Sequence, residues 1–240
     1  MLILAVDTST RVGSLAVLRN QNLLGEIASR SDEHYSSRLF QDLDRLLAQL
    51  DVSLQQIDLF AVTAGPGSFT GLRVGLTAVK AWAEAGGKSV AAISGLEAVA
   101  AQVAAPSGRL VAAVIDARRG QVFGGLYESA VLDFAGREEI VLKRVGDDVV
   151  VSPDEFLSMV ARQMKDTIPL FASPTPDVIQ AALASSALRI TQVEKVSGVL
   201  APVIGRLGHG MALRGEVMDA LDLGANYVRR TDAEVNWKGA

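Results

Sequence analysis

A glycine-rich segment between an apolar run and a helical pattern has residue types that could hold an anion. Residues 57–63 are the apolar run, typical of a buried strand, and Gly65-Pro66-Gly67 forces a turn. Ser68 or Thr70 can cap a helix predicted over Gly71–Ala85, whose N-terminus could cradle a phosphate. The segment matches neither G-x-x-x-x-G-K-[ST] nor G-x-G-x-x-G, because Thr70 stands at the third glycine and no lysine is placed to meet a phosphate.

Small residues form a stripe along this predicted helix. Gly71, Gly75, Ala78 and Trp82 recur at helical spacing. A glycine inside a helix costs about 1 kcal/mol relative to alanine, so two of them one turn apart indicate a close approach to the backbone. The neighbour could be an element of the same domain, a helix of another subunit or a phosphate, and the sequence leaves these three alternatives open.

The chain offers few groups for nucleophilic or metal chemistry. It has no cysteine and only two histidines, His34 and His209, which excludes a thiolate site and a histidine-based metal site of the usual type. A carboxylate-only magnesium site stays open, but no Asp/Glu cluster has the spacing for it. As a catalytic base, His34 beside Glu33 would need a nucleophile, and there is no G-x-S-x-G elbow. The alternative is a helix-entry residue bonded to backbone.

Composition predicts a globular protein without a membrane span. Of the 240 residues 49% are hydrophobic and 21% charged, and the net charge is −4 with a pI near 5.3. This balance does not favour a surface built for nucleic acid. The first residues, MLILAVDT, lack a basic n-region and carry Asp7 in the apolar run, so we expect no signal peptide and a soluble, cytoplasmic protein.

Hydrophobic periodicity predicts alternating strands and helices in two lobes. In the first half we expect strands over 2–6, 13–18, 23–28, 57–63 and 89–93, and helices over 36–50, 71–85 and 94–103. In the second half we expect strands over 110–115, 121–127, 140–145, 168–172 and 188–193, and helices starting at Ser152-Pro153 and spanning 177–185 and 198–213. The segment with Pro106 and Gly108 separates an N-terminal lobe, 1–106, from a smaller C-terminal lobe, 107–240, whose last segment could pack back.

The two halves open in the same way. Leu4-Ala5-Val6-Asp7 and Ala113-Val114-Ile115-Asp116 are each followed by a tight basic turn and a returning strand. Two such lobes resemble the α/β actin/hexokinase/Hsp70 superfold (ASKHA), with duplicated ribonuclease-H-like lobes.

This resemblance implies that strand-end aspartates and adjacent hydroxyls hold magnesium and the phosphates of ATP. It makes Asp7, Thr8, Ser9 and Asp116 candidate cofactor-binding residues. No hydroxyl follows Asp116, and both aspartates could instead cap local backbone N–H groups.

Five segments together resemble the TsaB (YeaZ) family over essentially the whole chain. They are ILAVDTST near the start, Glu33-His34, TAGPGSFTGLRVGL at 63–76, IDARRGQVFGGLY at 115–127 and Tyr227-Val228-Arg229-Arg230. The resemblance implies a role in making threonylcarbamoyladenosine at adenosine 37 of tRNAs that read ANN codons. It also implies a non-catalytic subunit that forms a heterodimer with the transferase TsaD, a homodimer when alone, and a complex joined by the ATPase TsaE. Contact with tRNA would then be indirect.

The family resemblance also implies that catalysis belongs to the partner. TsaD carries N-H-x-E-x-H, whose histidines bind a metal, where this chain has Ser94-Gly95-Leu96-Glu97-Ala98-Val99, with Gly95 and Val99 in their place. We therefore expect no catalytic or metal-ligating residue here, no cofactor required by this chain, and ATP and metal on the partner subunits.

Two helices, 36–50 and 71–85, are predicted to form a four-helix interface with TsaD or with a second copy. The interface residues that we expect are Leu39, Leu43, Leu46, Gly71, Arg73, Gly75, Ala78 and Trp82. The alternatives are an active ASKHA-type small-molecule kinase or ATPase, a peptidase-like protein, and a stand-alone binding domain. The tail Tyr227–Ala240 could contact tRNA or another subunit.

Overall fold

The computed structural model describes residues 1–30, 35–105, 108–134, 137–164, 168–186, 188 and 192–228. The first half consists of β1 (Leu2–Asp7), β2 (Val12–Arg19), β3 (Asn22–Arg30), α1 (Tyr35–Gln49), η1 (Leu54–Gln56), β4 (Leu59–Gly65), α2 (Phe69–Gly86), β5 (Ser89–Ser94) and α3 (Gly95–Ala101). The second half consists of β6 (Leu110–Arg118), β7 (Gln121–Phe134), β8 (Arg137–Val151), α4 (Pro153–Gln163), β9 (Leu170–Ser173), α5 (Asp177–Ser185), β10 (Glu194–Lys195), α6 (Ala201–Leu213) and η2 (Ala220–Asp222).

The two sheets have the same topology. Their strand orders are β3-β2-β1-β4-β5 and β8-β7-β6-β9-β10, and in each sheet the first three strands along the chain are antiparallel while the last two are parallel to the first. The helices also recur after the same strands, so the chain is one pattern used twice. The predicted α/β, two-lobed ASKHA fold with duplicated ribonuclease-H-like lobes is confirmed. A division into separate domains at 106/107 stays a prediction.

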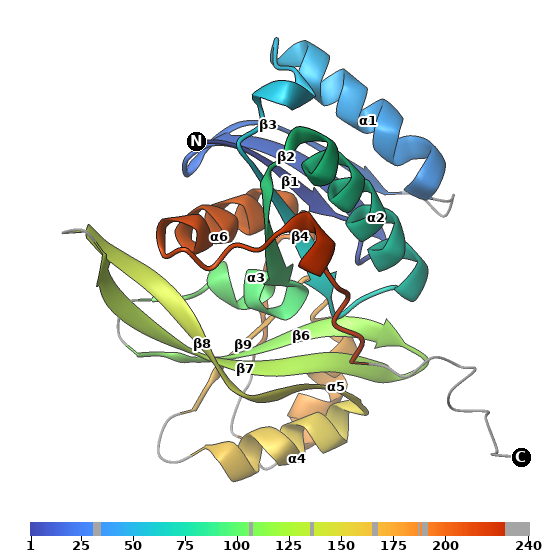
Figure 1. Ribbon diagram of the computed structural model, residues 1–240. Helices are drawn as coiled ribbons and strands as arrows, with labels where there is room; N and C mark the ends of the chain where they lie inside the picture. Colours follow the sequence, from blue (N-terminus) through green and yellow to red (C-terminus); the bar gives the residue numbers. More distant parts are fainter. Residues whose placement is uncertain are drawn as a thin grey trace, which may run out of the picture.

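The helices and sheets stack in layers, as Figure 1 shows. Helices α1 and α2 cover the outer face of the first sheet, and α4 and α5 cover the outer face of the second. Helices α3 and α6 lie between the sheets. The inner core is continuous from one lobe to the other, since it joins Ile3 and Ile93 of the first sheet to Val111 and Ile115 of the second.

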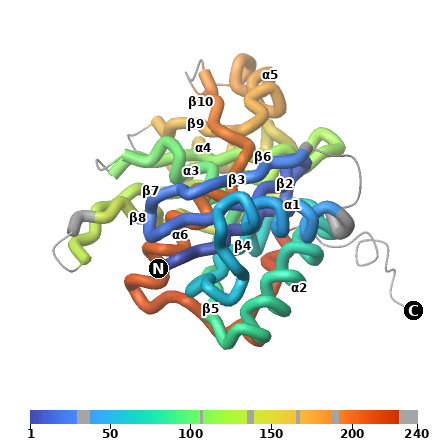
Figure 2. Tube along the Cα trace, turned by 90° about the horizontal axis from the view of Figure 1, so that it is seen from above, coloured from blue at the N-terminus to red at the C-terminus, as the bar shows by residue number. Residues whose placement is uncertain are grey.

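The end of the chain returns to the first lobe. Helix α6 packs on β1, β2 and β4, and Met218 forms a backbone bridge with Val90 at the edge of β5. The Lys80 ammonium donates to the Leu221 carbonyl at 2.9 Å. Figure 2 shows this segment, in red, running beside α2 and β5. The first lobe is therefore completed by residues that the sequence analysis assigned to the second.

Most of the predicted elements are present, with two kinds of error. The hairpin β7–β8 is much longer than the predicted strands 121–127 and 140–145, because its outer part is a two-stranded ribbon that tolerates charged residues on exposed faces. The predicted strand 188–193 is wrong within its described residues. The apolar side chains of Leu188 and Val193 pack against the outer core of the second lobe, and strand pairing begins only at Glu194.

Helix α3 ends at Ala101 rather than at 103, and α6 begins at Ala201 rather than at 198. Among the described residues, no helix is both long and apolar enough to cross a membrane.

Candidate functional site

The glycine-rich turn between β4 and α2 is enclosed by other parts of the first lobe. Gly65 has a φ of +137°, and a Cβ there would overlap the Asn226 carbonyl oxygen, so only glycine fits. A Cβ at Gly67 would lie 2.5 Å from the Ser9 carbonyl oxygen. That same oxygen accepts a 2.7 Å hydrogen bond from the backbone N–H of Ser68. The turn is thus held between the loop after β1 and the C-terminal segment.

The two glycines of α2 face this same loop. A Cβ at Gly71 would overlap the Thr8 carbonyl oxygen, and a Cβ at Gly75 would overlap Thr8 Oγ1. Thr8 Oγ1 donates to the Gly71 carbonyl at 2.7 Å. The sequence left three explanations for the small-residue stripe. This close contact agrees with the first, in which the neighbour is an element of the same domain.

Most of the predicted interface residues lie inside the first lobe. Leu39, Leu43 and Leu46 are 6%, 4% and 1% exposed and pack from α1 onto the outer face of the sheet. Gly71, Gly75 and Ala78 are buried as well. Arg73 is exposed and Trp82 is half-buried. Direct contact of these eight residues with a partner stays a prediction.

An aromatic pair lies on the outer surface of these helices. Phe40 of α1 is 51% exposed and meets Trp82 of α2 edge to face, with ring centroids 5.9 Å apart. Trp82 also contacts Phe60 of β4 at 6.3 Å, so it connects this surface to the core. The packing of α1 leaves Phe40 outside the buried apolar face that Leu39, Leu43 and Leu46 form on the same helix.

A second exposed group joins α2 to the C-terminal segment. The Tyr227 ring stacks on Phe69 at 4.8 Å, and the Arg73 guanidinium lies over the same Phe69 ring at 3.9 Å. Arg73 Nε also donates to the Tyr227 hydroxyl at 3.3 Å. The predicted tail beyond Val228, from 229 to 240, lies outside the described residues, as does His34.

The candidate nucleotide-binding residues of the first lobe are sealed. Asp7, Thr8 and Ser9 are 0%, 3% and 2% exposed. Asp7 Oδ1 accepts from Ser9 N at 3.0 Å and from Ser9 Oγ at 2.6 Å, while Oδ2 has no partner among the described residues. Burial raises the pKa of Asp7, although the hydrogen bonds from Ser9 lower it. A carboxyl group whose side chain is closed to solvent on every side does not fit a magnesium–phosphate site.

The corresponding aspartate of the second lobe is accessible to solvent and caps the turn that follows it. Asp116 is exposed, and its Oδ1 accepts from the backbone N–H of Arg118 at 2.7 Å. Arg118, Arg119 and Gly120 all have positive φ, and together they make the tight turn into β7. The described residues contain no group of three or more His, Cys, Asp or Glu side chains that could hold a metal ion. The other histidine in the chain, His209, is 9% exposed on α6.

Sequence reasoning missed a polar group between the lobes. Ser94, Tyr127 and Asp148 meet there; Tyr127 ends the segment IDARRGQVFGGLY, but Asp148 belongs to no motif that the sequence analysis singled out. The signal was Gly146-Asp147-Asp148 inside a β-branched run, which is typical of a bulge that redirects a side chain.

Comparison with known families gives a match over half of the chain. The profile of the family described as "TsaD: tRNA N6-adenosine threonylcarbamoyltransferase" matches residues 22–147. That range contains α1, the glycine-rich turn, α2 and most of the β6–β8 meander.

Similar proteins match over longer stretches. The "tRNA threonylcarbamoyladenosine biosynthesis protein TsaB" of Bacillus subtilis is 29% identical, with 99% of this chain and 98% of that protein covered. The protein of the same name from Haemophilus influenzae is 32% identical over 66% of this chain and 67% of its own length. The solved structure "YeaZ from Pseudomonas aeruginosa" superposes with a TM-score of 0.73 at 27% identity and covers 94% of this chain and 99% of that one. In fold and in sequence, the chain belongs to the TsaB (YeaZ) family.

Proposed function

We propose that this chain is a non-catalytic partner subunit in the synthesis of threonylcarbamoyladenosine at adenosine 37 of tRNAs that read ANN codons. It forms a heterodimer with the transferase TsaD, helps to recruit TsaE, and forms a homodimer through the same surface when TsaD is absent. Contact with tRNA is indirect, through the complex. The pathway is supported by the names of the relatives, and the absence of catalysis by the geometry of the first lobe.

The observation that carries the non-catalytic role is the burial of Asp7. The chain keeps the strand-end aspartate of the superfold. However, Asp7 Oδ1 accepts two hydrogen bonds from Ser9, and the whole side chain is closed to solvent. A carboxylate that is closed to solvent offers no accessible oxygen to a hydrated magnesium ion in this conformation. The chain therefore retains the framework of a nucleotide-binding lobe, while the Asp7 side chain stabilises the turn after β1 by hydrogen bonds.

The docking surface that we propose is the exposed side of α1 and α2, centred on Phe40 and Trp82. Large aromatic side chains that lie near the centre of an interface supply much of the binding free energy. Phe40 is half-exposed in this chain, and Trp82 holds it against the core through Phe60. The buried residues Leu39, Leu43, Leu46, Gly71, Gly75 and Ala78 position this surface by fixing the two helices on the sheet.

A charge placed at Phe40 tests the docking surface. We expect Phe40→Asp to weaken binding to cognate TsaD by more than about tenfold, because a carboxylate would be desolvated in the interface. Ile168→Asp is the matched control, since Ile168 is 55% exposed in the second lobe, away from α1 and α2. Calorimetry measures both affinities. Equal affinities of Phe40→Asp and the unaltered chain would overturn the assignment of this surface.

Reconstitution tests the function itself. Purified chain is combined with TsaD, TsaE, unmodified tRNA, threonine, bicarbonate, ATP and the enzyme that supplies threonylcarbamoyl-adenylate. We expect modified nucleoside only when both the chain and TsaD are present, and none from the chain without TsaD. Full modification without the chain would contradict the proposal, and ATP turnover by the isolated chain would favour the kinase or ATPase alternative.

A further inference from the structure

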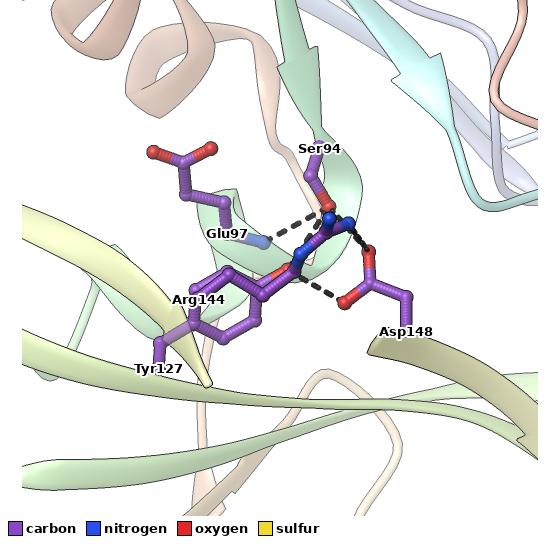
Figure 3. A network of polar contacts seen from close by, with 5 residues as sticks. All are labelled: Ser94, Glu97, Tyr127, Arg144 and Asp148. Carbon is purple, nitrogen blue, oxygen red and sulfur yellow. Dashed lines mark hydrogen bonds and ion pairs between the residues drawn. The ribbon is translucent and has the colours of Figure 1, made fainter. Parts of the chain in front are cut away.

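Three polar side chains, of which Tyr127 and Asp148 are buried and Ser94 is half-buried, join the two lobes (Figure 3). Ser94 ends β5 in the first lobe, whereas Tyr127 lies on β7 and Asp148 on β8 in the second. The Tyr127 hydroxyl donates to Asp148 Oδ1 at 3.0 Å and lies 3.2 Å from Ser94 Oγ. Ser94 Oγ is also 3.5 Å from Asp148 Oδ2, and it accepts from the N–H of Glu97 as the cap of α3. One hydroxyl thus connects the start of α3 to the second sheet.

The second sheet is shaped to bring Asp148 to this position. The register of β7 with β8 shifts between Gly124↔Val149 and Leu126↔Val145, which leaves two extra residues on β8. Gly146, with φ +78°, lies in this bulge and Asp148 ends it. A bulge turns a side chain out of the regular alternation of a strand. Here it directs a carboxylate into the layer between the lobes.

Glycine opposite the bulge leaves room for the carboxylate. A Cβ at Gly125 would lie 2.5 Å from Asp148 Oδ1 and 3.0 Å from Tyr127 Cε2. On the other face of β7, the preceding Gly124 makes room for the ring of Phe156. Two adjacent glycines weaken a strand, so each has a packing reason in this structure.

The polar group is costly to disrupt once it is buried. Tyr127 is 1% exposed and Asp148 is 8% exposed. Burial raises the pKa of Tyr127 far above its usual range, so its hydroxyl stays protonated and available as a donor. Arg144 Nη1 lies 3.7 Å from Asp148 Oδ2 at the solvent edge of the group. Removing any one member would leave a buried donor or acceptor without its partner.

Much of the remaining contact across this layer is apolar, although the Gln102 side chain after α3 also exchanges two hydrogen bonds with the backbone of Ser197, at 3.1 and 2.8 Å. Ile93 and Leu96 of the first lobe pack with Ile115 and Phe123 of the second. Apolar burial is not directional and permits small rotations of one surface on another. Buried hydrogen bonds have narrow geometry, so they can select one orientation among several that bury similar areas.

We propose that Ser94, Tyr127 and Asp148 form an interlobe lock that holds the two lobes of this chain in a single relative orientation. The chain then presents its surfaces as one rigid body and does not open and close between its lobes. The lock is a property of the isolated chain, so it stands or falls independently of which partner the chain binds.

Distances between spin labels test the lock. The chain has no cysteine, so a label pair can be introduced at Glu26→Cys on β3 and Ala161→Cys on α4, both exposed. We expect one narrow distance distribution for the otherwise unaltered chain. Tyr127→Phe and Ser94→Ala, each in this background, should broaden the distribution at least about twofold, because more than one orientation becomes populated.

Two features keep the test decisive. Tyr227→Phe is the matched control, since it removes a tyrosine hydroxyl whose partner among the described residues is Arg73 of α2, away from the layer between the lobes, and its distribution should stay narrow. Ser94→Ala removes the one hydroxyl that makes both hydrogen bonds of this group between the lobes, so it decides the outcome if Tyr127→Phe fails to fold. A folded Ser94→Ala chain with the original narrow distribution would show that these hydrogen bonds do not set the orientation, and the lock would be wrong.

Discussion

The two lobes share one framework but differ at the same structural position. In both, an aspartate ends the first strand and a tight turn follows. Asp7 of the first lobe is fully buried, whereas Asp116 of the second is exposed. The difference arises from the helix that follows the fourth strand of each sheet.

That helix is long and glycine-lined in the first lobe and short in the second. Helix α2 spans 18 residues and presses Gly71 and Gly75 onto the loop after Asp7, whereas α5 spans 9 residues and begins after Pro174-Thr175-Pro176. Sheet topology alone therefore does not decide whether a strand-end carboxylate is available to a ligand. The close approach of a neighbouring helix decides it.

The largest effect should come from filling the contact between α2 and the loop after β1. We expect Gly71→Ala to destabilise the chain by about 3 kcal/mol, because the new Cβ overlaps the backbone oxygen of Thr8, which has little freedom to move. This cost exceeds the gain of about 1 kcal/mol in helix propensity. Gly198→Ala, whose Cβ would lie 3.6 Å from Pro174 Cβ, is the control and should change stability little. Urea unfolding measures both, and equal midpoints would contradict the close contact.

The next effect concerns Glu97, beside the layer between the lobes. Burial raises the pKa of Glu97 to about 7 from its ordinary 4.5. The nearby charges are Arg214, Asp148, Glu216 and Arg144. The folded chain thus holds a proton that the unfolded chain releases. The contribution of Glu97 to the free energy of unfolding should be fully present below pH 4.5 and be lost as the pH rises to 7. The loss should be about 2 kcal/mol once the partial exposure of the side chain is allowed for.

Glu97→Gln isolates this dependence. Figure 3 shows the Glu97 carboxylate turned away from the Ser94–Tyr127–Asp148 group, so the substitution leaves those hydrogen bonds in place. We expect the variant to match the unaltered chain near pH 4.5 and to exceed its stability at pH 8. Denaturant midpoints across this range measure the difference. Parallel pH profiles of the two chains would show that Glu97 does not titrate as inferred.

A smaller effect on stability should distinguish substitution of Asp7 from substitution of Asp116. Asp7→Ala removes the acceptor of two buried hydrogen bonds from Ser9, so we expect a loss of about 1–2 kcal/mol. Asp116→Ala removes an exposed acceptor of one backbone hydrogen bond and should cost about 0.5 kcal/mol. Thermal unfolding of the two variants measures the contrast. A larger loss for Asp116→Ala would reverse the comparison between the lobes.

The smallest effect should come from the helix caps. Ser152 accepts from Glu155 N, and the Glu155 carboxylate accepts from Ser152 N at 3.0 Å, which completes a capping box for α4. At the start of α2, Ser68 accepts from Gly71 N at 3.3 Å, and the described residues show no reciprocal side-chain bond to the Ser68 backbone. We expect Ser152→Ala to cost about 1 kcal/mol and Ser68→Ala somewhat less. Urea midpoints that rank Ser68→Ala as more costly would contradict this order.

Several features of the fold could be predicted because they have local causes. Helix α5 begins and ends where its pattern indicated, and Ser152-Pro153 with Glu155 starts α4 as expected. The long ribbon of β7 and β8 was missed because exposed strand pairs lack an alternating apolar pattern. The short strand at Glu194 was missed because it has only two residues, both exposed.

The candidate site was predicted less well, because burial depends on neighbours that are distant in sequence. Leu39, Leu43 and Leu46 were assigned to an interface from their stripe on α1, but a stripe does not tell whether it meets the chain's own sheet or a partner. Phe40 is exposed because α1 turns that side away from the sheet.

The sequence by itself determined the order of elements, the repeat of one lobe pattern and the family, since these follow from local periodicity, turn chemistry and residue identity. Only the tertiary structure decided which surfaces meet. Thr8 and Gly71 are 63 residues apart, and Arg73 and Tyr227 are 154 apart, yet each pair is in contact. Such contacts depend on how whole sheets and helices stack, which no local pattern encodes.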